Sequence, residues 1–111
     1  MDTHQLAQDR IDLAHADPHG RSAHLVVHDG PLRQTVIALT KGTRLAEHSS
    51  PPAGSILVLR GTVAVTTADD VETLPAGFLT TLTHDRHGVE ALSDAAILLT
   101  TVTGTEPAPP A

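Results

Sequence analysis

Residues 42–61 read GTRLAEHSSPPAGSILVLRG, and this stretch decides the fold. A strand-like run ends at His48, two prolines follow, and a second apolar run over residues 55–60 ends at Gly61. Proline cannot donate a hydrogen bond to a β-ladder, so Pro51 and Pro52 end the first strand before the second begins. The stretch therefore predicts two β-strands, at 43–48 and 55–60, with a proline-containing connection between them.

The pattern of short apolar runs separated by turn residues extends over most of the chain. Thr and Val recur in these runs, as half-buried pleated surfaces prefer. The further predicted strands are residues 23–28, 33–40, 62–67, 71–74, 78–83, 87–92 and 95–103. Short strands at regular spacing, without a strong helix between them, predict an antiparallel sandwich or barrel.

The two ends of the chain differ from this β-region. Residues 1–22 are predicted to form a short helix, over 2–15, and a linker, with Asp2 as N-cap and Gln5 reaching back to it. Leu6, Ile11 and Leu13 would form its weak apolar stripe. The β-barrel is expected over 23–103, and the proline-rich tail 104–111 is expected to be disordered.

Composition excludes several classes of function. The 111 residues suit one domain, and the formal net charge of −6 argues against binding to nucleic acid or to an anionic membrane. The chain has no apolar run of membrane-spanning length and no basic, apolar start typical of a signal peptide, so a cytoplasmic protein is expected. With one Phe and no Trp, Tyr or Cys, the core is predicted to be thin and aliphatic, and completed by a partner subunit.

The spacing of glycines and histidines resembles the two cupin motifs. The first cupin motif is G-x5-H-x-H-x3,4-E-x6-G. Gly42, His48 and Gly61 match it, while Ser50 and Gly54 stand where the second His and the Glu are expected.

The second cupin motif resembles residues 76–92, with Gly77 and His87 at motif positions and Leu82 and His84 in place of its Pro and Gly. The resemblance covers residues 33–103 and narrows to small single-domain bacterial cupins of unassigned function. It implies a cupin-type jelly-roll barrel (a double-stranded β-helix) and a homodimer.

The resemblance also implies which residues would line a site. Cupins commonly hold Fe, Mn, Ni, Zn or Cu with three His and one Glu. Here His48 and His87 remain, with His84 as a tentative third metal ligand. Because a serine hydroxyl is a poor ligand for such ions and two imidazoles seldom hold a catalytic ion, the metal site is interpreted as degenerate. The favoured function is small-molecule binding by His48, Ser50 and His87.

Two alternatives remain open at this stage. The first is a metal-dependent cupin enzyme, of dioxygenase or isomerase type, that uses His48 and His87 with atypical further ligands. Strand alternation would place Glu47 on the opposite face from His48, together with Leu45, and would place His24 and His28 on one face of their strand. The second alternative is a structural or interaction role. No nucleophile elbow of the form Gly-x-Ser-x-Gly is present in the sequence.

Overall fold

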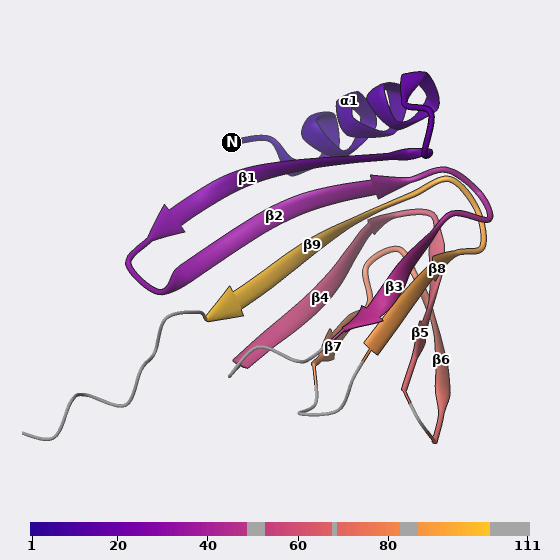
Figure 1. The fold of residues 1–111 in the computed structure, drawn as a ribbon. Helices are drawn as coiled ribbons and strands as arrows, with labels where there is room; N and C mark the ends of the chain where they lie inside the picture. Colours follow the sequence, from indigo (N-terminus) through magenta and orange to yellow (C-terminus); the bar gives the residue numbers. More distant parts are fainter. Residues whose placement is uncertain (49–52, 68, 83–86, 103–111) are drawn as a thin grey trace, which may run out of the picture.

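The computed structural model of the chain describes residues 1–48, 53–67, 69–82 and 87–102, without the side chains of residues 46–48. Within these residues one helix and nine strands form (Figure 1): α1 (Thr3–Ala16), β1 (Arg21–Asp29), β2 (Leu32–Leu39), β3 (Arg44–His48), β4 (Ala53–Arg60), β5 (Thr62–Thr66), β6 (Val71–Pro75), β7 (Leu79–Thr81), β8 (His87–Ala91) and β9 (Ala95–Val102). Each predicted strand is present, with bounds that differ by a few residues. The predictions for Ser50, for His84 and for the tail 104–111 lie outside the described residues.

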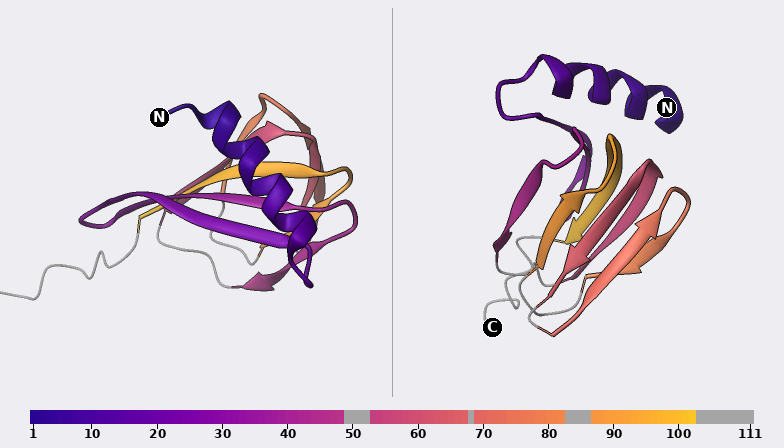
Figure 2. Two further views of the ribbon diagram at one scale, coloured as in Figure 1. Left: turned by 90° about the horizontal axis from the view of Figure 1, so that it is seen from above. Right: turned by 90° about the vertical axis from the view of Figure 1, so that its right-hand side faces the viewer.

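The strands form two antiparallel sheets that pack face to face (Figure 2). The larger sheet has the order β1-β2-β9-β4-β7, and the smaller has the order β3-β8-β5-β6. The chain crosses between the sheets repeatedly, so strands distant in sequence become neighbours, as in a jelly roll. The predicted all-β jelly-roll fold with a short N-terminal helix is therefore confirmed.

The core between the sheets is aliphatic in the part of the chain that the structure describes. It is built from Leu, Ile, Val and Ala side chains contributed by both sheets, among them Leu39, Ile56 and Val58 from the larger sheet and Val63 and Val89 from the smaller. The one aromatic residue, Phe78, is 55% exposed and takes no part in this core. The prediction of an aliphatic core is confirmed.

Helix α1 packs on the outer face of the larger sheet, and it does so through alanines rather than through the predicted leucines. Its buried residues are Ala7, Ile11 and Ala14, which cluster with Ala38 of β2 and Ala96 of β9. The predicted stripe is wrong at Leu13, which is 47% exposed. Small side chains on both surfaces let the helix lie close to the sheet.

The N-terminal cap of α1 has one of its two predicted contacts. The Asp2 side chain accepts hydrogen bonds from the backbone N–H groups of His4 and Gln5. However, the Gln5 side chain donates forward to the carboxylate of Asp9, at 2.9 Å, and not back to residue 2. The cap therefore depends on Asp2.

Two of the three register shifts in the described ladders change faces that the sequence predicts. In β1 the pairing with β2 shifts between Leu25 and Val27, and in β3 the pairing with β8 shifts between Leu45 and His48. A β-bulge of this kind interrupts the alternation of side chains along a strand. The expected grouping of Leu45 on the face away from the interior is consequently wrong, because Leu45 packs against the core.

Asp94, between β8 and β9, connects α1 to the sheets. One carboxylate oxygen accepts a hydrogen bond from the backbone N–H of Lys41 at 2.9 Å, and the other lies 2.7 Å from Nε2 of His15. The hydrogen bond from Lys41, followed by the one to His15, lowers the pKa of the Asp94 carboxyl below its ordinary value. Asp94 thus holds the last turn of the helix beside two inter-strand turns.

Candidate functional site

His87 faces the space between the two sheets. It is the first residue of β8, a strand that pairs with β3 on one side and with β5 on the other. Val89 and Ala91 lie two and four residues further along and belong to the core. Because side chains alternate along a strand, His87 has the same inward orientation, and it is only 6% exposed.

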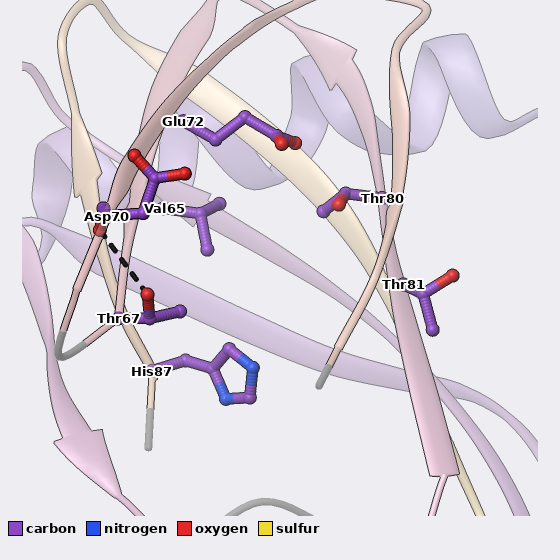
Figure 3. A pocket seen from close by; sticks show the side chains of 7 residues that line it. All are labelled: Val65, Thr67, Asp70, Glu72, Thr80, Thr81 and His87. Atoms are coloured by element: carbon purple, nitrogen blue, oxygen red, sulfur yellow. Dashed lines mark hydrogen bonds between the residues drawn. The ribbon is translucent and has the colours of Figure 1, made fainter. Parts of the chain in front are cut away.

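A cavity of about 160 Å³ lies beside this histidine. Its wall is formed by four elements or their ends, and the residues that line it are Val65, Thr67, Asp70, Glu72, Thr80, Thr81 and His87. Figure 3 shows the imidazole projecting into the space between β5 and β6 on one side and β7 on the other. A cavity of this order accommodates a molecule about the size of benzene.

The polar groups of the cavity lie above and around the imidazole. Glu72 points inward because its cross-strand partner, Val65, is a core residue, and its carboxylate extends toward Thr80 in Figure 3. Asp70 stands near Thr67, whose hydroxyl lies 3.5 Å from the Asp70 backbone oxygen. The described lining thus presents one imidazole, two carboxylates and the hydroxyls of Thr67 and Thr80, with no Lys or Arg among these residues, whereas the Thr81 side chain points away from the cavity in Figure 3.

The predicted site residues are described to different extents. His87 lines the cavity as expected. The backbone of His48 is its direct partner in the β3–β8 ladder, so the two motif histidines occupy opposite positions on neighbouring strands. The side chain of His48, and Ser50 and His84 as a whole, lie outside the described part of the chain.

The sequence reasoning missed Glu72 and the threonines of the cavity. A usable signal was present for Glu72, because it lies two residues before Leu74 in the run VETL. Residues two apart on a strand share a face, and Leu74 belongs to the core. Thr80 carries no comparable signal, since its position depends on the pairing of β7 with β4.

His24 and His28 do not form a pair, which corrects the prediction that they share a face. His24 is the partner of Val36 and His28 is the partner of Arg33. Those two β2 residues are three apart on a regular strand and therefore point to opposite faces, as do their partners. The bulge at Val26 is the cause, and both histidines are exposed.

The described residues do not converge on a metal ion. Among them, no three His, Cys, Asp or Glu side chains lie close enough together to hold one. Although His87 shares its cavity with Asp70 and Glu72, catalytic metal sites usually need three protein ligands on one point. No step that uses a metal follows from this arrangement.

The described residues also contain no helix that is both long enough and apolar enough to span a membrane.

Comparison with known proteins gives structural relatives only, since no family model and no curated protein matches the chain. A conserved protein of unknown function from Streptococcus pyogenes is 23% identical, with 86% of this chain and 80% of that one covered and a TM-score of 0.71. An RmlC-like cupin protein from Desulfovibrio desulfuricans is 26% identical, with 74% and 81% covered and a TM-score of 0.66. A salicylate 1,2-dioxygenase from Pseudaminobacter salicylatoxidans is 14% identical over 88% of this chain and 33% of its own, with a TM-score of 0.75.

Proposed function

Since the chain has the fold of the cupins, we propose that it binds a small molecule in the cavity beside His87. The observation that carries this proposal is a 94%-buried imidazole lining a cavity of about 160 Å³ between the two sheets. A buried histidine at a cavity wall can present a ring edge to a ligand.

The other polar groups of the wall support the proposal. Ligand pockets characteristically combine an apolar wall with a few convergent polar groups that orient the bound molecule. Val65 supplies an apolar surface, and Thr80 and Glu72 supply a hydroxyl and a carboxylate across the cavity from His87. Hydroxyls and carboxylates accept hydrogen bonds, so a ligand with several donors, such as a small polyol or amine, suits these groups.

We include His48 and Ser50 in the proposed ligand site. The support for His48 is its backbone position opposite His87 in the β3–β8 ladder, because directly opposite residues in an antiparallel pair are near neighbours. Ser50 follows two residues later in the sequence. Variants at these two positions therefore belong in the same binding experiment.

The proposal predicts a ligand-dependent rise in thermal stability that needs His87. A library of small polyols, amines and carboxylates would be screened by thermal unfolding, followed by far-UV circular dichroism because the chain has no Trp or Tyr. A hit should lose at least about tenfold in affinity in His87→Ala, which corresponds to about 1.4 kcal/mol, a typical hydrogen bond involving a buried polar group.

The matched control is His24→Ala, which removes an exposed imidazole from β1. This variant should bind each hit as the unsubstituted chain does. Equal binding by His87→Ala and the unsubstituted protein would contradict the proposal, provided that both variants unfold cooperatively.

A second candidate function is a metal-dependent cupin enzyme built on His48 and His87, with Fe, Mn, Ni or Zn. The observation that favours it is again the register that places the two histidines opposite each other. Elemental analysis of tag-free protein, as purified and after incubation with each ion, tests it directly. About one ion per chain, lost in both His48→Ala and His87→Ala, would support this candidate over the first, and an ion retained in both variants would contradict it.

A further inference from the structure

A groove lies on the side of the molecule where the two sheets are not joined. In the described part of the chain, β1 pairs with β2 alone and β3 pairs with β8 alone, so both are edge strands. They lie on the same side in the left-hand view of Figure 2. The groove has a volume of about 460 Å³, and its lining includes Asp17, His19, Arg21, Ala23, Ile37 and Leu45. We call it the β1–β3 groove.

The floor of the β1–β3 groove is apolar. Ile37 of β2 and Leu45 of β3 pack against the core, and each keeps part of its surface exposed. Ala23 of β1 is the direct partner of Ile37 in the β1–β2 ladder, so these two side chains share a face, and Ala23 is exposed. An apolar group placed in the groove would remove this surface from water, which is favourable.

Arg21 brings a positive charge to the same face. It lies two residues before Ala23 in a part of β1 without a register shift, and residues two apart on a strand point to the same side. Its partner in β2 is the core residue Leu39, which confirms the inward face. Unlike Leu39, Arg21 is exposed. The groove therefore has a guanidinium beside its apolar floor.

The guanidinium of Arg21 is also uncommitted within the part of the chain that the structure describes. Its backbone N–H donates to Asp17, but its side chain has neither a hydrogen bond nor an ion pair with any described residue. Each of the other described arginines donates a side-chain hydrogen bond to a protein acceptor, and these are Arg10, Arg33, Arg44 and Arg60. Arg21 thus keeps its fork of N–H donors for a bound molecule.

The carboxylate of Asp17 also lines the groove, and it is engaged by the chain itself. One of its oxygens accepts hydrogen bonds from the backbone N–H groups of His19, at 2.8 Å, and of Arg21, at 3.4 Å. The imidazole of His19 lies in the same lining and offers a ring N–H. The donors available to a ligand are therefore the side chains of Arg21 and His19.

We propose that the β1–β3 groove binds a small amphipathic carboxylate, a molecule with an aliphatic or aromatic body and one carboxylate group. The carboxylate would accept two parallel hydrogen bonds from Arg21, as guanidinium and carboxylate geometry allows. The apolar body would lie on Ile37 and Leu45. Since the chain has a net charge of −6, which repels anions, a carboxylate without an apolar body, such as acetate, should bind far more weakly.

The β1–β3 groove is a different site from the cavity beside His87. The described linings of the two have no residue in common. Ligands with several hydrogen-bond donors suit the carboxylates of that cavity, whereas the groove offers donors to an anion. The two proposals can therefore fail separately.

NMR of protein labelled at its isoleucine methyl groups tests the proposal, with octanoate and benzoate as probes. The chain has four isoleucines, Ile11, Ile37, Ile56 and Ile97, so each signal can be assigned by substitution. The Ile37 signal should shift saturably with either acid. The signal of Ile11, which is buried between α1 and the opposite face of the larger sheet, should stay in place. Octanamide and benzamide, which lack the charge, should bind at least about tenfold more weakly.

The variants separate the guanidinium from the overall charge. Arg21→Gln should lose at least about tenfold in affinity for both acids, which corresponds to about 1.4 kcal/mol. Arg33→Gln is the matched control, because it removes the same charge from the neighbouring strand at a residue outside the described lining of the groove, and it should bind as the unsubstituted chain does. Ala23→Asp, which places a carboxylate beside the floor, should also lose binding. Circular dichroism shows whether each variant is folded.

Four outcomes would overturn the proposal. The first is the absence of a saturable Ile37 shift up to about 10 mM of either acid. The second is equal binding by Arg21→Gln and the unsubstituted chain, and the third is an equal loss in Arg33→Gln, which would show a general effect of charge. The fourth is binding that His87→Ala abolishes and Arg21→Gln leaves intact, because the acids would then occupy the cavity between the sheets.

Discussion

At the scale of single residues, Asp94 makes the stability of the fold sensitive to acid. Its carboxylate is held by the Lys41 backbone N–H and by His15, and these contacts lower its pKa from the ordinary value of 3.8. A lowered pKa in the folded state means that the charged form stabilises the fold above pH 3.8. This contribution disappears as the pH falls through the lower, folded-state pKa.

Asp94→Asn should therefore weaken the dependence of the unfolding free energy on pH in acid. Urea unfolding of both proteins, measured at several values between about pH 6 and about pH 2, gives the difference in unfolding free energy. We expect this difference to be largest above the ordinary pKa of the carboxyl and to shrink toward the lowest pH. Because the Asp94 side chain is 42% exposed, its effect is screened by solvent and should be small. A constant difference across the whole range would show that the carboxylate charge makes no contribution.

Individual residues also show where prediction from sequence ended. His87 could be assigned to the interior because the glycine and histidine spacing resembles that of cupins. Sequence spacing could not show whether His24 and His28 share a face. An extra residue in β1 reverses the alternation of side chains and leaves no distinctive sequence signal. The inward orientation of Glu72 could be predicted from its spacing to Leu74. Its place in a cavity could not, because residues of β7 form part of the cavity wall.

At the scale of elements, the docking of α1 depends on the smallness of the residues beneath it. Ala38 of β2 has no exposed surface, and it clusters with the helix residues Ala7 and Ala14. Ala38→Leu should force α1 away from the sheet and lower the unfolding free energy by about 1–3 kcal/mol, as overpacking of a filled core does.

Denaturant unfolding monitored at a helix-sensitive wavelength measures this loss. Leu13→Ala is the control, because that side chain is 47% exposed on the same helix and its loss should cost within about 0.5 kcal/mol. Equal stability of Ala38→Leu and the unsubstituted chain would contradict the close packing of helix and sheet.

The strands themselves were predictable, and the helix contact was not. Gly and Pro punctuation together with runs rich in Val and Thr gave the positions of all nine described strands to within a few residues. The predicted stripe is wrong at Leu13, which is 47% exposed, because apolar size alone does not show which residues face a closely packed sheet. In fact the flat surface of Ala38 and Ala96 accommodates Ala14 better.

At the scale of the whole molecule, the position of β9 has a consequence for how the chain is made. This strand lies at the centre of the larger sheet, between β2 and β4, yet it comes after the other eight described strands in the chain and is synthesised after them. Until residues 95–102 emerge, β2 has only β1 beside it and β4 only β7. Unpaired strand edges of this kind are templates for wrong pairing. A nascent or truncated chain that ends before β9 thus exposes two such edges, and translation to the end of β9 is what joins the β1–β2 pair and the β4–β7 pair into one sheet.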